Sequence, residues 1–127
     1  MANTINSLQT LTKPCSSGAV IQYAALYQDT SADNTTKLPA GAASSLKFEG
    51  FARYGDANHV EGDPMEIIAE GEGLAVAGAA VSVGDALESA GATGKVQTRT
   101  SGTTIARALT AAGADGDIIR VKILRTT

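Results

Sequence analysis

The chain has 127 residues, a formal net charge of −3 and a hydrophobic fraction of 43%, but only 4% aromatic residues and no tryptophan. This length predicts one domain, and the weakly negative charge argues against nucleic-acid binding. Alanine supplies much of the apolar fraction and buries little area, so the predicted core is thin for the length.

A thin core is commonly supplemented by disulfides, a metal ion or association with other chains. Cys15 is the single cysteine, which excludes a disulfide within the chain. His59 is the single histidine, so we expect no metal site and no cofactor. Association remains, and we predict a homo-oligomer. The sequence shows no secretory signal and no apolar run of about 20 residues, which predicts synthesis in a cytoplasm and no membrane partner.

The first 17 residues are polar, lack a regular hydrophobic period and contain Pro14. They predict an extended N-terminal arm at 1–17, followed by a single β domain at 18–127. Such an arm either frays or adds as a strand to a neighbouring subunit.

Beyond the arm, the pattern predicts an all-β fold of short strands. Alternation predicts a strand at 18–28 and another at 45–54, in which a polarity switch at Gly50 indicates a bulge. From residue 65 onward, turn residues separate further short runs at 65–69, 74–77, 80–83, 86–89, 95–100, 104–109 and 118–124. A helix over 105–112 is favoured by propensity, but only about two turns are available. The spacing is typical of a small β-sandwich or β-barrel-like domain.

Catalytic chemistry has little support in the sequence. Cys15 lies far from His59, so a cysteine–histidine pair has no local support. Acidic pairs next to glycines are better explained as turn caps than as paired acids or a Ca²⁺ loop. These pairs are Glu61 with Asp63, Glu70 with Glu72, and Asp115 with Asp117. We therefore predict that the protein is not an enzyme.

Charge is unevenly distributed along the chain. Residues 49–72 contain seven acids and one base, Arg53. From Lys95 onward the sequence contains six bases and two acids. These blocks are either solvated strand faces or complementary edges that meet between subunits. Arginine suits interfaces because its planar fork makes paired hydrogen bonds. The candidate interface residues are Met1, Ala2, Asn3, Thr4, Ile5, Asn6, Leu8, Leu11, Arg99, Arg107, Arg120 and Arg125.

The C-terminal half carries four motifs in a fixed order. They are Ala-Val-Ser-Val-Gly-Asp-Ala-Leu at 80–87, Gly-Lys-Val at 94–96, Ile-Ala-Arg-Ala-Leu-Thr-Ala-Ala at 105–112 and Gly-Asp-Ile-Ile-Arg-Val-Lys-Ile at 116–123. In this order the chain resembles the small capsid cement (decoration) proteins of tailed phages, although Ala106 stands where that family often has glycine. The resemblance implies trimers on the outer capsid surface of a virion. There they would bridge neighbouring major capsid proteins and stabilise the shell.

Two other functions remain open. Another virion component, such as a tail or head fibre, would use the same turn pattern. A non-catalytic β-barrel binding or accessory module is the second, and a carbohydrate-binding form of it would need exposed aromatic side chains. The sequence places the aromatic residues in strands, which predicts that they pack in the interior. They are Tyr23, Tyr27, Phe48, Phe51 and Tyr54.

Overall fold

The computed structural model describes residues 7–39, 48–55 and 58–124, and within them it contains nine strands and no helix. The described part of the chain therefore offers no helix able to cross a membrane. The all-β prediction is confirmed. The strands are β1 (Ser7–Pro14), β2 (Ala25–Gln28), β3 (Thr36–Lys37), β4 (Phe48–Ala52), β5 (Pro64–Val76), β6 (Ala86–Ser89), β7 (Val96–Thr98), β8 (Ala106–Ala108) and β9 (Ile118–Ile123).

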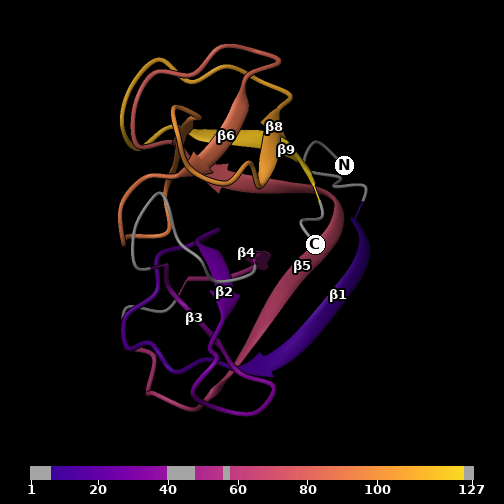
Figure 1. Ribbon diagram of the computed structural model, residues 1–127, viewed down its shortest axis with the longest axis vertical. Helices are drawn as coiled ribbons and strands as arrows, with labels where there is room; N and C mark the ends of the chain where they lie inside the picture. The colour runs from indigo at the N-terminus through magenta and orange to yellow at the C-terminus, as the bar shows by residue number, and fades with distance from the viewer. Residues whose placement is uncertain (1–6, 40–47, 56–57, 125–127) are drawn as a thin grey trace.

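The long strand β5 joins two parts of one curled antiparallel sheet (Figure 1). Its first half pairs with β1 and β4, and its second half, from Glu72 to Val76, pairs with β9. The strand order is β3-β2-β4-β5-β9-β8-β6-β7, with β1 also on β5. We call β1–β4 with the first half of β5 the lower part, and the second half of β5 with β6–β9 the upper part.

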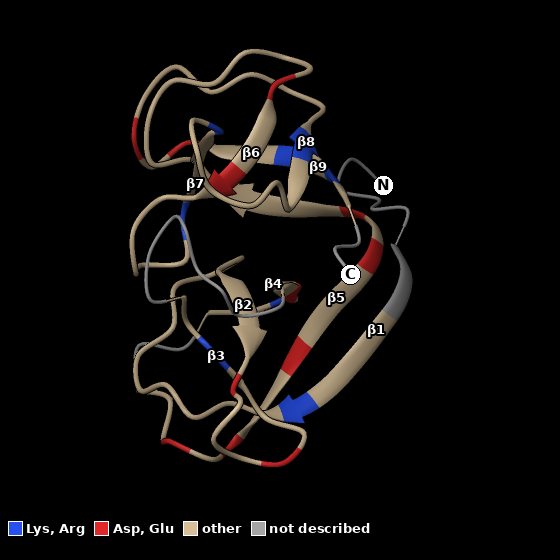
Figure 2. Cartoon of the chain, viewed as in Figure 1, with Lys and Arg blue, Asp and Glu red and all other residues tan. Residues whose placement is uncertain are grey.

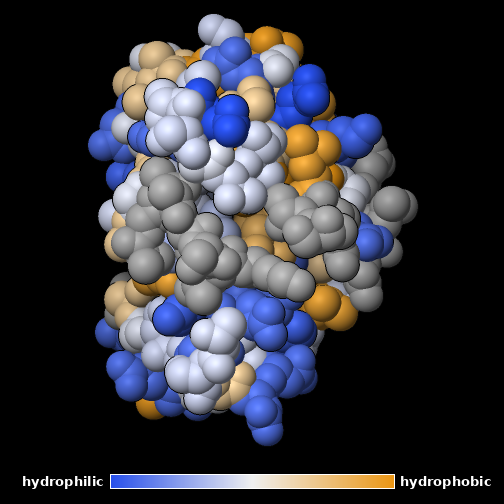
Figure 3. Space-filling view, in the orientation of Figure 1, coloured by the Kyte–Doolittle hydropathy of each residue, from blue (hydrophilic) through white to orange (hydrophobic). Residues whose placement is uncertain are grey.

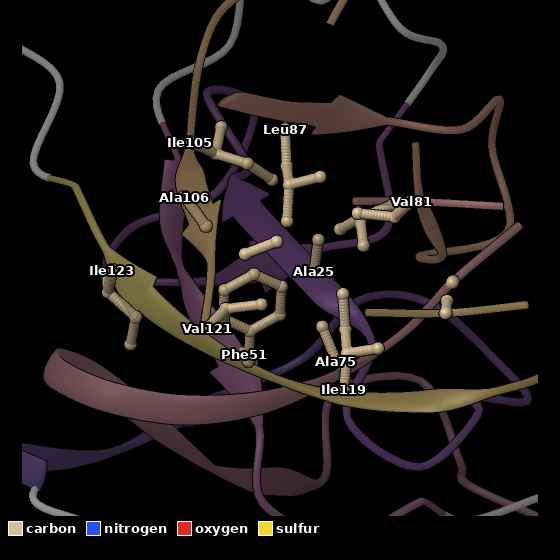
Figure 4. Close-up of a cluster of buried hydrophobic side chains, with 14 of the residues drawn as sticks. Ala25, Phe51, Ala75, Val81, Leu87, Ile105, Ala106, Ile119, Val121 and Ile123 are labelled. Atoms are coloured by element: carbon tan, nitrogen blue, oxygen red, sulfur yellow. The ribbon is translucent and has the colours of Figure 1, made fainter. Parts of the chain in front are cut away.

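Two hydrophobic clusters fill the curled sheet, and β2 lies between them. Ala25 and Tyr27 point into a large cluster that occupies the upper part, together with Phe51 from β4 (Figure 4). Leu26, from the same strand, points into a smaller cluster in the lower part. Since successive side chains of a strand face opposite sides, a strand between two cores is apolar on both faces. This explains why the first three residues of β2 are all buried.

Four strands begin directly after the same kind of turn. In each turn the fourth N–H donates to the first carbonyl, and the third residue has a positive φ, as in a type II turn. The turns are Ile21–Ala24 before β2, Val60–Asp63 before β5, Ser82–Asp85 before β6 and Ala114–Asp117 before β9. The third residues are Tyr23 (φ 60°), Gly62 (94°), Gly84 (91°) and Gly116 (96°).

Three strand predictions differ from the structure. The strand predicted at 18–28 begins only at Ala25, because the turn at Tyr23 carries no glycine to mark it. The runs predicted at 65–69 and 74–77 form one strand that ends at Val76, since pairing with neighbouring strands carries β5 through the glycines between them. The predicted strand at 80–83 contributes only an isolated bridge, Val81 to Ala112.

The bulge predicted at Gly50 is confirmed. Leu26 of β2 lies opposite Gly50, whereas the next residue, Tyr27, lies opposite Phe48, so Glu49 is the extra residue. A Cβ at residue 50 would lie 2.4 Å from the Ile68 carbonyl oxygen of β5, which leaves room only for glycine. Because of the bulge, both Phe48 and Phe51 reach the upper cluster, and their ring centroids are 5.1 Å apart.

The turn between β6 and β7 fastens the upper part to the lower part. Gly94, in that turn, accepts a hydrogen bond of 2.8 Å from the Ala25 N–H at the start of β2. A Cβ on Gly94 would lie 2.6 Å from the Ala24 Cβ. The buried Tyr27 hydroxyl adds a second link, 2.6 Å from the Ser89 hydroxyl of β6. Burial raises the pKa of Tyr27, so this phenol stays protonated near neutral pH.

Asp29 ties the loop after β2 to the segment that follows β1. The Ser16 hydroxyl donates to Asp29 at 2.6 Å, and both the N–H and the hydroxyl of Ser31 donate to its other oxygen. These hydrogen bonds, from Ser16 first and then from Ser31, lower the pKa of Asp29 from 3.8 to about 2.

A lowered folded-state pKa means that Asp29 stabilises the fold above pH 3.8 and loses this effect as the pH falls towards 2. We therefore expect Asp29→Asn to lower the melting temperature at pH 6. The difference from the wild type should shrink below about pH 4. Thermal unfolding followed by circular dichroism from pH 2 to 7 measures this, and a difference that stays constant over the range would contradict the assignment.

Candidate functional site

A cleft of about 740 Å³ opens where the lower and upper parts meet. Two of its residues directly follow β4, two follow β8, four belong to β5 or β9, and one precedes β2. Its lining is mostly apolar or aromatic, with two arginines. The lining residues are Tyr23, Arg53, Tyr54, Ile68, Leu74, Leu109, Thr110, Ile118 and Arg120.

The register between β5 and β9 brings apolar and basic side chains together on the outer face of the upper part. On β9, Ile119, Val121 and Ile123 are buried, so the alternate residues face outward. Arg120 pairs with Leu74 of β5, whereas Ile118, 55% exposed, pairs with Val76. Ile118 and Arg120 therefore lie on the same outward face of β9, next to Leu74 and Val76 of β5.

Three cations lie close together on two neighbouring strands. Arg107 of β8 is directly opposite Lys122 of β9. Arg120 precedes Lys122 by two residues and lies on the same face of β9. We call Arg107, Arg120 and Lys122 the basic face, and Figure 2 shows the basic segments of β8 and β9 close together. Like charges directly opposite each other are unfavourable in a sheet, although Glu72 of β5 lies across from Lys122. A surface that keeps this arrangement is suited to an acidic partner.

The two arginines of the cleft differ in how their charge is balanced. Arg53 forms an ion pair of 3.1 Å with Glu66 and lies 5.4 Å from the ring centroid of Tyr54. Its charge is therefore paired within the chain. Arg120 is half-buried, and no ion pair among the described residues includes it. Its guanidinium is the cation in the cleft that remains available for a partner's carboxylate.

Tyr23 holds an unfavourable backbone conformation at the edge of the cleft. Its φ is 60°, in the left-handed region that glycine occupies in the other three turns of this kind. A non-glycine residue there costs energy that its surroundings must offset. Tyr23 lines the cleft, which gives a reason for tyrosine at this position.

The structure places the predicted interface residues in different regions. Residues 1–6, with Met1, Ala2, Asn3, Thr4, Ile5 and Asn6, and also Arg125, lie outside the described residues. The rest of the predicted arm contains β1, in which Leu8 lies and Leu11 faces Ile67 of the chain's own β5. The Nε of Arg99 donates to the Gly102 carbonyl oxygen at 2.8 Å, which uses this arginine to hold its own loop. Of the predicted arginines in the described part, Arg107 and Arg120 lie together.

The prediction that all aromatic side chains pack inside is wrong for two of them. Tyr27 and Phe51 are buried and Phe48 packs against them, as predicted. Tyr54 is 56% exposed, and both it and Tyr23 lie outside strands and line the cleft. The missed signal is local, because Tyr23 stands where the matching turns have the glycine of a Gly-Asp pair.

The fold brings Cys15 and His59 into one region without joining them chemically. The Asp63 carbonyl oxygen accepts from the Cys15 N–H, and it lies 3.0 Å from Nε2 of His59. The other ring nitrogen, Nδ1, lies 2.8 Å from the Ser17 carbonyl oxygen. Both nitrogens are thus engaged with backbone carbonyls, which leaves neither in position to take a proton from the buried Cys15 thiol.

The turn-cap interpretation of the acidic pairs is confirmed at Asp117. Its carboxylate accepts from the N–H groups of Gly113 and Ala114, at 2.8 and 3.2 Å, within the turn before β9. Asp115 forms an ion pair of 2.9 Å with Lys95. Asp117 therefore caps its own turn, whereas Asp115 pairs with a cation 20 residues away in the sequence. No group of three or more metal-ligating side chains occurs among the described residues.

No protein-family model matches the chain, and no curated protein matches its sequence. In fold, the chain is similar to a solved structure described as the crystal structure of the head fiber gp8.5 N base in bacteriophage phi29. The TM-score is 0.57 at 19% sequence identity, and the match covers 94% of this chain and 96% of that chain. The likeness extends over almost the full length of both chains, and at this identity it is a likeness of fold.

Proposed function

We propose that this chain is a structural component of a bacteriophage head and that it forms the base of a head fibre on the outer capsid surface. The observation that carries the proposal is the shared fold with the head fibre base of phi29 over 94% of the chain. The motifs in the C-terminal half, which resemble phage capsid cement proteins, support the same location independently. The protein acts by binding and has no catalytic role.

Surface chemistry supports a binding role. The basic face and the exposed Ile118 lie on the outside of the upper part, beside the cleft. Figure 3 shows apolar side chains reaching the surface next to charged ones. Such mixed surfaces suit docking onto another protein better than docking onto nucleic acid, which needs a broad excess of cations. We propose the major capsid protein as the partner and a homo-oligomer as the form that binds it.

A cement protein is the second candidate, and the motif resemblance favours it. The two roles differ in mechanics. A cement protein bridges neighbouring shell subunits and so stabilises the assembled state, because its contacts exist only there. A fibre base needs only to be anchored. The fold comparison supports the fibre base more directly than it supports cementing.

The test is to mix the purified chain with shells of the phage that encodes it, prepared without this protein. We expect co-sedimentation with the shells at a fixed ratio, and little change in the temperature at which the shells disrupt. A rise of several degrees in that temperature would instead favour the cement protein. Absence of the chain from the shell pellet over micromolar concentrations would contradict the proposal in both forms.

A further inference from the structure

We propose that the cleft between the lower and upper parts is the docking site for an extended segment of a shell subunit that carries a carboxylate next to a bulky apolar side chain. This inference rests on the proposed function and names the surface and the partner chemistry that it uses.

The four matching turns provide an internal comparison. Three of them have glycine at the left-handed position, at φ values of 91 to 96°, and each glycine is followed by aspartate. The fourth turn has Tyr23 followed by Ala24, yet it makes the same hydrogen bond and starts β2 in the same way. Glycine would therefore satisfy the fold better at position 23. Tyr23 belongs to neither hydrophobic cluster but lines the cleft, so we infer that the advantage of tyrosine over glycine at this position lies in the cleft.

The charges of the cleft select the partner. Glu66 already neutralises Arg53, whereas Arg120 has no ion pair among the described residues. The basic face continues from Arg120 to Lys122 and Arg107. One carboxylate on the partner would pair with Arg120, and further acids would meet the rest of the basic face.

The remaining lining selects an apolar neighbour for that carboxylate. Leu74, Ile118 and the two tyrosine rings offer a surface for an aliphatic or aromatic side chain. Tyrosine and arginine are enriched among the residues that dominate protein–protein binding energy. At about 740 Å³, the cleft has room for a few side chains of an extended segment, which is less than a folded domain requires.

The first experiment replaces the strained residue. We expect Tyr23→Gly to raise the melting temperature by about 2–6 °C, because it relieves a left-handed non-glycine residue. The same variant should bind the shells at least about tenfold more weakly than the wild type. The matched control is Asn34→Gly, which also relieves a positive φ, of 50°, but lies outside the cleft. It should bind the shells as the wild type does.

The outcomes separate the two proposals. If the wild type fails to bind shells, the proposed function falls. If the wild type binds and Tyr23→Gly binds equally well, the cleft inference is overturned while the proposed function stands. A Tyr23→Gly variant that melts no higher than the wild type would also overturn the inference. The inference requires that tyrosine at this positive φ lowers the stability of the fold.

The second experiment identifies the occupant. The photo-crosslinker p-benzoyl-L-phenylalanine is placed at Tyr54, in the cleft, or at Val60, which is 62% exposed and does not line the cleft. After irradiation on shells, we expect Tyr54 to give a crosslink to a shell-subunit peptide that contains Asp or Glu beside a bulky apolar residue. Val60 should give none to that peptide. A crosslink from position 54 only to a second copy of this chain, only to a glycan, or to nothing would overturn the inference.

Discussion

Gly94→Ala is expected to lower the free energy of unfolding by about 2–4 kcal/mol. Two effects add at this position. The φ of Gly94 is 94°, which strains any residue with a side chain, and the new methyl group would lie 2.6 Å from the Ala24 Cβ. One of the two parts would have to move away from the other, which also strains the hydrogen bond from the Ala25 N–H to the Gly94 carbonyl.

Gly84→Ala is the matched control for this prediction. Gly84 has nearly the same φ, 91°, but a Cβ there meets nothing within 4 Å. The Gly84→Ala variant should therefore lose only about 1 kcal/mol of its free energy of unfolding, from backbone strain alone. Urea unfolding measures the free energy of unfolding of both variants. The difference between the two losses is the cost of the contact between the new methyl group and the lower part. Equal losses in the two variants would show that the turn at Gly94 is not packed against the lower part.

Glu88→Leu is expected to lower the free energy of unfolding by about 3–5 kcal/mol. Glu88 of β6 is fully buried, no ion pair among residues 7–39, 48–55 and 58–124 includes it, and its carboxylate accepts four hydrogen bonds. The donors are the Gln97 amide, the Thr100 N–H and hydroxyl, and the Gly102 N–H. Leucine would fill a similar volume but would leave these donors without an acceptor. Chemical denaturation of the variant measures the loss.

Glu66→Leu provides the control, because Glu66 follows its Gly-Asp turn at the same distance as Glu88. Its ion pair with Arg53 is largely exposed, with side-chain exposures of 34% and 48%, so its loss should cost at most about 1 kcal/mol. A loss at Glu88 no larger than the loss at Glu66 would contradict the role of the buried carboxylate.

The pH dependence of Glu88 follows from the same contacts. Burial raises the pKa of Glu88, but the hydrogen bonds from Gln97, Gly102 and Thr100 together outweigh burial, so the pKa lies below its usual value of 4.5. The ionised form therefore stabilises the fold above pH 4.5, and this stabilisation is lost as the pH falls below it. Acid should loosen the loop that carries Thr100 and Gly102 first.

The parts of the fold that local chemistry determines could be predicted from the sequence. The Gly-Asp turn before β6 gave a predicted strand at 86–89 that the structure reproduces residue for residue. The two separate strands predicted at 65–69 and 74–77 are wrong because β1 and β9 carry one strand through Gly71 and Gly73 by pairing that is distant in sequence. The low strand propensity of glycine is a local property, so it does not show which distant strands pair with that position.

The candidate site was predictable only in part for the same reason. Arg107 and Arg120 could be chosen from charge alone, and the structure puts them on neighbouring strands. The cleft also needs Tyr54 after β4 and Leu74 in β5, which come together only because the sheet curls. Tyr23 was assigned to a strand, because a left-handed tyrosine has no recognisable signal until its turn is compared with the three glycine turns.

Electron cryomicroscopy of shells carrying the protein tests the central claim most directly. We expect density for this curled sheet on the outer surface of the shell, oriented so that Tyr54 and Arg120 face a shell subunit. A density that places the cleft towards solvent, with another surface of the chain on the shell, would contradict the assigned binding face. Density inside the shell or on the tail would contradict the proposed role as a head fibre base.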